Sequence, residues 1–195
     1  YKRQIKRCHH YKRKEVNMEL DILRAIDSIH NPVLDSIMVF ITHLGDAGIF
    51  WIAISVVLLF FKKYRKIGVV SLGALILSVL FTNVIIKNLF DRVRPFMYDE
   101  AVRQRLLIAE PFDSSFPSGH SSASMAAAVS IFIYNKKMGI PAVVAALLIA
   151  FSRLYLFVHF PTDVLTGLIL GILYAVASAA VVKFLNEKYK FKWLQ

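Results

Sequence analysis

The sequence predicts an all-α membrane protein, a helical bundle with five or six transmembrane helices. Of its 195 residues, 57% are hydrophobic and 19% are charged, whereas soluble domains average about 45–50% apolar and about 25% charged. Five segments lack Asp, Glu, Lys and Arg altogether: 47–61, 67–86, 118–135, 138–152 and 164–182. Segments of about 17–25 apolar residues match the thickness of a bilayer, and flanking residues complete the two shorter ones. A soluble single-core globule and a disordered chain are therefore excluded.

The N-terminal region predicts a basic tail followed by one membrane domain. Residues 1–17 are rich in Lys and Arg and lack the apolar stretch of a signal peptide, so we expect a tail or a segment foreign to the native protein. Residues 18–195 are expected to form a single integral-membrane domain. Its first helix, 18–30, has an apolar stripe suited to lying at a membrane interface. A short helix over 33–44 either completes a span with 18–30 or enters the membrane part-way, which leaves the number of spans at five or six.

The distribution of positive charge predicts the orientation of the bundle. Three segments are rich in Lys and Arg and are expected on the cytoplasmic side: 62–66, 136–137 and 183–192. The opposite side then holds the remaining connections, at 44–46, 89–117 and 157–162. The net charge of +11 is explained by this topology, so we predict no nucleic-acid partner. Cys8 is the only cysteine, which excludes a disulfide framework and any multi-cysteine metal site.

Two cations mark the end of the second apolar segment. Lys87 closes this segment and Arg94 follows seven residues later, so on a continuous helix both would lie on one face. Pro95 then disfavours helical backbone at Arg94 and turns the chain into the outer loop. Ionisable groups at membrane helix ends indicate function when they face protein or water. The alternative is that both are anchors that extend to the membrane surface.

A second polar cluster begins the third apolar segment, where the chain reads Pro117-Ser118-Gly119-His120. Ser is a favoured N-cap, and Gly allows a ligand to approach the backbone closely. The N-terminus of a helix, with free N–H groups, attracts anions. Taken alone, the pattern is equally compatible with an ordinary capped helix start.

The third cluster consists of Arg153, His159 and Asp163, beside Pro161 at the start of the last helix. Asp163 is placed to accept a hydrogen bond from His159, which would fix the imidazole tautomer and make the other ring nitrogen more basic. The alternative for Asp163 is helix capping.

The predicted topology brings all three clusters to the non-cytoplasmic end of the bundle. Three cations that converge indicate an anion with several oxygens, and Arg matches phosphate geometry. Two histidines without neighbouring Cys or further carboxylates indicate a nucleophile and an acid rather than metal ligands. His43 and Asp46 lie in the outer turn, where they either contact this site or only solvate the turn. The solvated turn is the simpler interpretation.

In chain order, these clusters read K-x6-R-P, P-S-G-H and S-R-x5-H-x3-D. They resemble the three signature motifs of the type 2 phosphatidic-acid phosphatase (PAP2) superfamily, over residues of about 85 to 185. The resemblance implies a compact helical bundle, a reaction that needs neither metal nor other cofactor, and a phosphohistidine intermediate.

The resemblance also implies a role for each motif residue. His159 would be the nucleophile on phosphorus and Asp163 its orienting partner, while His120 would protonate the leaving oxygen and then activate water. The phosphoryl oxygens would be held by five residues: Lys87, Arg94, Ser118, Gly119 and Arg153. Donors placed in advance around those oxygens stabilise the charge of the transition state.

Residues 30–36 and the following Ile41-Thr42 resemble the start of bacterial membrane undecaprenyl-diphosphatases of the bacitracin-resistance type. The expected function is hydrolysis of undecaprenyl diphosphate to undecaprenyl phosphate at the extracytoplasmic face of a bacterial plasma membrane. Some members of that subgroup have Asp where this chain has Gly119, so the substrate stays open and the alternative is a phosphatidylglycerophosphate or phosphatidic-acid phosphatase. A further alternative, from another class of protein, is a catalytically dead lipid-binding or transport protein. The expected partners are a lipid phosphate or diphosphate and the membrane lipids, and the oligomeric state is left open.

Overall fold

The computed structural model describes residues 13–190, and every regular element in that range is helical. The α-helices are α2 (Arg13–Asp27), α3 (Pro32–His43), α4 (Ile49–Phe60), α5 (Arg65–Leu77), α6 (Lys87–Phe90), α7 (Glu100–Gln104), α8 (Gly119–Tyr134), α9 (Lys136–Tyr155) and α10 (Pro161–Tyr189). Shorter turns connect them at η1 (Asp46–Gly48), η2 (Lys62–Tyr64) and η4 (Pro95–Tyr98), and a π-helical segment, η3 (Ser78–Ile86), joins α5 to α6. All five apolar segments are therefore helices, as predicted.

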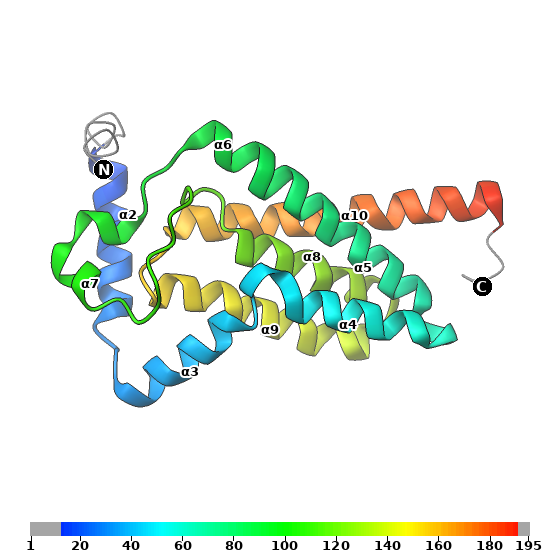
Figure 1. Cartoon of the computed structure of the whole chain (residues 1–195), viewed down its shortest axis with the longest axis horizontal. Helices are drawn as coiled ribbons and strands as arrows, with labels where there is room; N and C mark the ends of the chain where they lie inside the picture. The colour runs from blue at the N-terminus through cyan, green and yellow to red at the C-terminus, as the bar shows by residue number, and fades with distance from the viewer. Residues whose placement is uncertain (1–12, 191–195) are drawn as a thin grey trace.

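The helix α8 forms the centre of the bundle. It packs against α9 and α10 and also against α5, so little of its surface faces outward (Figure 1). Its small side chains, among them Ala126, Ala127 and Ala128, are fully buried and let the neighbouring helices approach closely. Two of its buried hydroxyls bond to other helices: Ser122 with Ser78 of η3 at 2.5 Å, and Ser124 with Trp51 of α4 at 2.9 Å.

Two glycines of α10 set its distance from α8. A Cβ at Gly167 would lie 2.6 Å from the carbonyl oxygen of Ser118, and a Cβ at Gly171 would lie 2.5 Å from that of Ser122. Any larger residue would push the two backbones apart. The absence of a side chain at these two positions therefore permits the close packing of α10 on α8.

The outer helices present apolar side chains to their surroundings. Ile52, Val56 and Phe60 on α4 are exposed, and so are Leu165 and Ile172 on α10. Exposed apolar surface of this extent indicates contact with lipid. Among the described residues, three segments are long and apolar enough to cross a membrane, and the number rises to four if the bent pair Pro32–His43 and Asp46–Phe60 counts as one span. Those three segments are Lys62–Tyr98, Lys136–Tyr155 and Pro161–Tyr189. The central helix α8 has 16 residues and is surrounded by the others, so its outer face need not be apolar.

In the part of the chain that the structure describes, two helices, α2 and α3, precede α4. Helix α2 begins at Arg13, within the predicted tail of residues 1–17, and its Val16 is buried; residues 1–12 lie outside the described part of the chain. Helix α3 continues into α4 at an angle of 45° rather than pairing with α2 as one span. Helix α2 instead runs across the end of the bundle (Figure 1), where Leu20 and Leu23 of its apolar stripe are buried.

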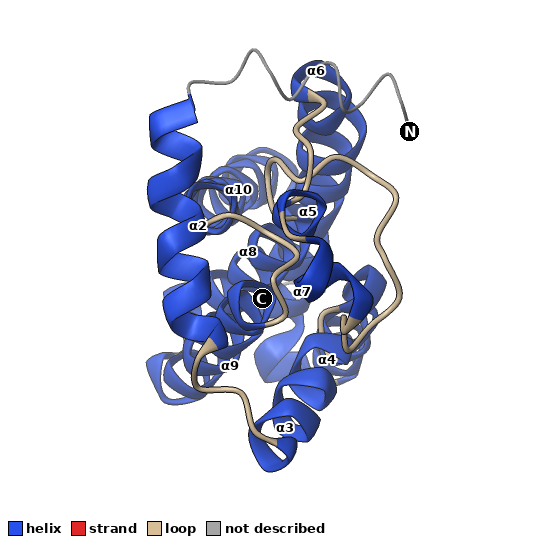
Figure 2. Cartoon of the chain, turned by 90° about the vertical axis from the view of Figure 1, so that its left-hand side faces the viewer, coloured by secondary structure: helices blue, strands red, loops and turns tan. Residues whose placement is uncertain are grey.

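The two ends of the bundle have different characters. The long loop after α7, the α9–α10 connection and α2 gather at one end, and Figure 2 looks onto it, with α2 along one side. The basic connectors at 62–66 and 136–137 and the end of α10 lie at the other end (Figure 1). The three predicted polar clusters all belong to the first end.

The close approach of α10 and α8 can be tested at Gly171. Valine there would overlap the Ser122 carbonyl and the Met125 side chain, and we expect it to lower the free energy of unfolding by roughly 1–3 kcal/mol. Thermal unfolding in detergent measures the effect. Ala177→Val on the exposed face of the same helix is the control. Equal unfolding temperatures for the two variants would contradict the packing argument.

Candidate active site

The first polar cluster is assembled by a break in the chain and not by helical periodicity. Helix α6 ends at Phe90 because Asp91 adopts a left-handed conformation, with φ of 38°. The chain is then extended through Arg94, and Pro95 begins the η4 turn. The prediction that Lys87 and Arg94 share one face of a continuous helix is wrong.

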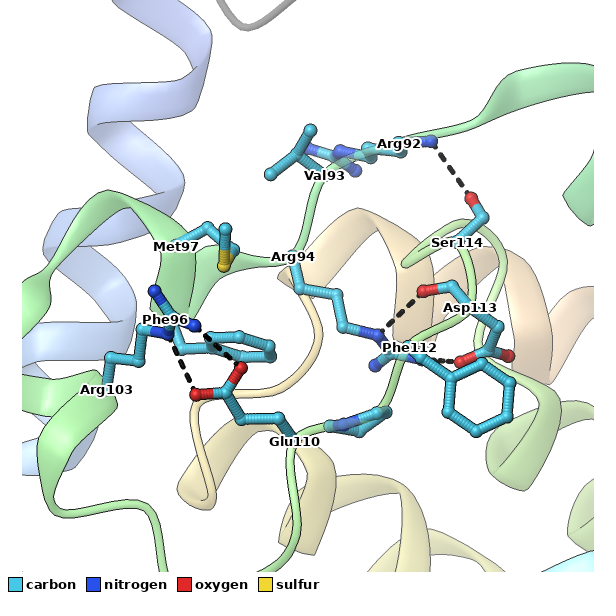
Figure 3. Close-up of a pocket in the computed structure, with 11 residues that line it drawn as sticks. Arg92, Val93, Arg94, Phe96, Met97, Arg103, Glu110, Phe112, Asp113 and Ser114 are labelled. Atoms are coloured by element: carbon cyan, nitrogen blue, oxygen red, sulfur yellow. Dashed lines mark hydrogen bonds and ion pairs between the residues drawn. The ribbon is translucent and has the colours of Figure 1, made fainter. Parts of the chain in front are cut away.

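Lys87 and Arg94 are nevertheless brought together, by a residue of the outer loop. One carboxylate oxygen of Asp113 accepts from Lys87 Nζ, and the other accepts from Arg94 Nη2 at 2.5 Å. The backbone carbonyl of Asp113 also accepts from Arg94 Nε at 3.0 Å (Figure 3). Both ion pairs hold the pKa of the Asp113 carboxyl well below its ordinary value, although burial alone would raise it.

Arg94 also reaches the histidine of the third cluster. Its Nη1 donates to the Val158 carbonyl at 2.8 Å and lies 3.3 Å from His159 Nε2. Because a guanidinium can only donate, Nε2 is the acceptor, so the ring proton belongs on Nδ1. The Nε2 lone pair of His159 therefore points toward the guanidinium of Arg94.

Asp163 lies on the other side of His159 and is fully buried. One of its oxygens accepts from the Phe160 N–H at 2.9 Å and from the Ser115 hydroxyl at 2.5 Å. The same oxygen is 3.6 Å from His159 Nδ1, which is longer than a hydrogen bond. Ser115 lies between them, since its hydroxyl is also 3.5 Å from that nitrogen. Asp163 thus caps α10 and faces the imidazole, but it does not accept the direct hydrogen bond from His159 that the sequence analysis expected.

Burial and charge together act on the His159 imidazole. The ring is 1% exposed. Burial, followed by repulsion from Arg94, Arg153 and Lys87, holds the pKa of His159 well below its ordinary value. The imidazole is consequently neutral near pH 7, which is the form that acts as a nucleophile.

The second cluster begins α8 and contacts the third through the backbone. The Ser118 N–H donates to the Asp163 carbonyl at 3.0 Å. The Ser118 side chain caps the helix, because its oxygen accepts from the Ser121 N–H at 3.3 Å. Gly119 leaves room for the side chain of Asn83, since a Cβ at Gly119 would lie 2.6 Å from Asn83 Oδ1. The approach of a ligand to the Gly119 backbone stays a prediction.

His120, in the first turn of α8, pairs with a residue that the sequence analysis assigned to a solvated turn. Its Nε2 lies 3.0 Å from Asp46 Oδ1, and the second oxygen of Asp46 is 2.6 Å from His43 Nδ1. The turn packs directly on the ring, since a Cβ at Gly45 would lie 2.6 Å from His120 Cδ2. Asp46 therefore contacts the site, and the simpler interpretation of this turn is wrong.

Arg153, near the end of α9, is 4% exposed and donates to the Thr42 hydroxyl at 2.6 Å. Its Nε is buried and has no hydrogen-bond partner among the described residues. A buried donor without a hydrogen-bond partner lowers the stability of the folded protein. Its presence here indicates that Arg153 Nε is available to an acceptor on a ligand.

Two cavities border these residues. One of about 200 Å³ lies over the outer loop, and Arg94, Phe112 and Asp113 are among the residues that line it (Figure 3). A second, of about 500 Å³, lies between α4, α5, η3 and α8. Its lining combines the apolar side chains of Ile52, Leu75 and Val79 with polar residues of the site: Asn83, Lys87, Asp113, Gly119 and His120. Within residues 13–190, no group of three or more His, Cys, Asp or Glu side chains is arranged to hold a metal ion.

The model of the PAP2 superfamily matches residues 68–187, which contain all three clusters. This chain belongs to the PAP2 superfamily. The undecaprenyl-diphosphatase BcrC of Bacillus subtilis is 34% identical over 162 residues, which cover 80% of each chain. Phosphatidylglycerophosphatase B of the same organism is 36% identical over 187 residues, which cover 87% of this chain and 83% of its own.

A solved structure is also similar. The crystal structure of a transmembrane PAP2 type phosphatidylglycerolphosphate phosphatase from Bacillus subtilis superposes with a TM-score of 0.71 at 30% identity, and the match covers 95% of this chain and 92% of that one.

The resemblance noted in the sequence is thereby confirmed, together with the all-α membrane bundle that it implied. Besides the three PAP2 motifs, the site contains contacts that sequence reasoning missed. Asp113 and Ser115 stand a few residues before the P-S-G-H motif, and that proximity was the available signal. Glu19 carried no signal, because its partners are more than 70 residues away in the chain.

Glu19 belongs to a buried network that ties α2 to the third PAP2 motif. Arg92 donates to Glu19 and to Asp163, the latter at 2.5 Å. Glu19 in turn accepts from the backbone N–H and the hydroxyl of Thr162, at 3.1 and 2.6 Å. The guanidinium of Arg92 also lies over the Phe160 ring, 4.1 Å from its centre. The network fixes the start of α10, and with it the position of Asp163.

Removal of the cation from this network tests its contribution. Arg92→Ala leaves two buried carboxylates without their shared partner, so we expect a loss of about 3–5 kcal/mol in the free energy of unfolding. Arg24→Ala, which removes an arginine from the exposed side of α2, is expected to cost less than about 1 kcal/mol. Denaturant or thermal unfolding in detergent compares the two. If both variants lost the same small amount, α2 would not be held by the Arg92 network.

Proposed function

We propose that this member of the PAP2 superfamily is a lipid phosphatase that converts undecaprenyl diphosphate to undecaprenyl phosphate. The observation that carries the proposal is the 500 Å³ cavity, which places apolar walls next to Lys87 and His120. Such a cavity suits a substrate with a long apolar chain and a charged phosphate head. The name of the BcrC relative supports the diphosphate as the substrate.

A second candidate substrate is supported by a separate observation. The relative with 36% identity and the solved structure with a TM-score of 0.71 are both named as phosphatases of phosphatidylglycerophosphate. That lipid also combines apolar chains with a phosphate monoester, so the same site chemistry serves it. A catalytically dead binding or transport protein is disfavoured because His120, His159 and Asp163 are all present and close to their partners.

In the proposed reaction, His159 Nε2 attacks phosphorus and the bond to the leaving oxygen breaks. The Nδ1–H of His159 faces Asp163, which stabilises the positive charge that develops on the ring. His120 donates a proton to the leaving oxygen, so the lipid product departs as an alcohol or a phosphate monoester. The phosphoryl group is then held on His159.

In the second step, water replaces the histidine on phosphorus. His120, which lost its proton in the first step, takes one from the attacking water. The P–N bond breaks, inorganic phosphate is released, and neutral His159 is regenerated. No metal is invoked in either step.

The phosphoryl oxygens need donors on several sides. Lys87 and Arg94 supply two cations, and Arg153 offers its buried Nε. The Ser118 hydroxyl and the Gly119 N–H at the start of α8 complete the set that we propose. Donors fixed in advance lower the barrier because they need no reorganisation when charge builds up.

We further propose that the site faces the extracytoplasmic side of a bacterial plasma membrane. The support is the separation of charge along the bundle, since the basic connectors lie at the end opposite the site (Figure 1). A lipid carrier presented on the outer leaflet would then reach the site from the membrane.

Hydrolysis by the purified chain is the decisive experiment. Undecaprenyl diphosphate, phosphatidylglycerophosphate and phosphatidic acid are supplied in turn with EDTA present, and released phosphate is measured. We expect preference for the diphosphate, and a loss of at least about 10³-fold in His159→Ala because the covalent route is removed. A preference for phosphatidylglycerophosphate would keep the mechanism and transfer the protein to phospholipid synthesis. Activity that survives in His159→Ala, or that requires metal, would refute the proposed mechanism.

Asp46 is proposed as a positioning residue for His120. Asp46→Asn keeps the shape of the turn but weakens the hold on the imidazole, so kcat is expected to fall by about 10–100-fold with little change in KM. His43→Gln removes the other neighbour of Asp46 and leaves the contact with His120, so its effect on kcat is expected to be smaller. The pH profile of kcat separates the two explanations: loss of a carboxylate partner shifts the limb assigned to His120, whereas a purely structural loss lowers all values alike.

A further inference from the structure

Asp113 binds the two cations that the proposed reaction assigns to the phosphoryl group. Its two carboxylate oxygens are divided between Lys87 Nζ and Arg94 Nη2. A phosphoryl group would use the same donors with two of its own oxygens. The carboxylate and the substrate therefore compete for one pair of cations.

Asp113 also stands between the nucleophile and both cavities. It lines the outer cavity together with Arg94 and Glu110, and it also lines the apolar cavity together with His120. His159, by contrast, is 1% exposed and lies against Arg94. A phosphoryl group that approaches His159 Nε2 must take the place of the Asp113 carboxylate on Arg94.

The position of Asp113 in the chain allows it to leave. It belongs to a stretch, 106–118, that contains no helix, and its side chain is 46% exposed. Phe112, on one side, is almost fully exposed. On the other side, Ser114 and Ser115 are fixed by hydrogen bonds to the Arg92 backbone at 2.9 and 2.8 Å (Figure 3). Rotation of the Asp113 side chain toward solvent frees Lys87 Nζ and Arg94 Nη2 without unfolding the loop, while the Asp113 carbonyl keeps Arg94 Nε in place.

We propose that the Asp113 carboxylate is a built-in ligand of the phosphate-binding cations, which an arriving phosphoryl group displaces and which returns as inorganic phosphate leaves. This inference rests on the proposed phosphatase function and adds a residue to its site. The low pKa of Asp113 means that the carboxylate is charged at any working pH, so it is always able to compete. Its competition lowers the affinity of the site for inorganic phosphate and so limits inhibition by product.

Phosphate binding tests the inference without relying on turnover. The full chain, purified in detergent, is titrated with inorganic phosphate by calorimetry, and the inhibition constant of phosphate is measured during lipid hydrolysis. Asp113→Asn removes the competing charge, so both constants are expected to fall by about tenfold or more.

Glu110→Gln is the matched control, because it removes the same charge from an ion pair in the same loop. Glu110 pairs with Arg103 at 2.8 Å (Figure 3), and we expect phosphate affinity to stay within about twofold of the wild type. Asp113→Glu keeps the charge and is expected to restore weak phosphate binding. Thermal unfolding is followed for every variant, and Asp113→Ser replaces the Asn variant if that one does not fold.

The outcomes separate this inference from the proposed function. If the wild type releases phosphate from lipids but Asp113→Asn binds phosphate equally or more weakly, Asp113 serves to hold the cations in place and the inference is overturned. If the wild type releases no phosphate from any of the three lipids and binds none, the proposed function fails, and the inference fails with it. If Asp113→Asn and Glu110→Gln both bound phosphate more tightly, the loss of any negative charge in this loop would explain the result. The inference about Asp113 would then be overturned as well.

Discussion

The end of the bundle holds Lys87, Arg94 and Arg153 close to a histidine that must stay neutral, and this concentration of positive charge governs the structure around it. Buried cations are tolerated only when carboxylates or other acceptors compensate them. Asp113 provides this for two of the three, whereas Arg153 has the Thr42 hydroxyl and a free Nε. The same charges that would bind a phosphoryl group also keep the proton off His159.

Helix packing maintains this arrangement, because the residues that pair at the site belong to different helices. The Ser118 carbonyl that contacts Gly167 belongs to the residue whose N–H bonds to the Asp163 carbonyl. The distance between α8 and α10 therefore also sets the distance between the second and third PAP2 motifs. Small residues are required in the bundle centre for the geometry of the site as well as for stability.

The sequence predicted the helices well because lipid imposes a strong pattern: each of the five segments without charge became a helix. It also identified the motif residues, since ionisable groups at the ends of apolar helices are unusual enough to stand out. It failed where the backbone departs from regular geometry. The left-handed residue Asp91 ends α6 and removed the helical face on which Lys87 and Arg94 were expected to meet.

The sequence also could not reveal pairings between distant segments. Asp113 lies in a loop without periodicity, and Glu19 lies on a helix whose pattern resembles that of any amphipathic segment. Neither residue differs by type from the exposed acids around it. Their roles follow from tertiary contacts, which composition and spacing do not encode.

Each of the two histidines has an aspartate partner, but the two pairs differ in burial, and this difference fits the reaction that we propose. The pair of His159 and Asp163 is buried, and three donors, from Arg92, Ser115 and Phe160, hold the Asp163 carboxylate in place. The pair of His120 and Asp46 is open, with side-chain exposures of 21% and 51%. A nucleophilic histidine has to be kept neutral and fixed in one tautomer, which burial accomplishes.

A group that gives a proton to the leaving oxygen and takes one from water must exchange protons with solvent, and of these two pairs only the open one can do so. In the proposed reaction, a pair of the same type thus serves two functions because the fold buries one pair and exposes the other.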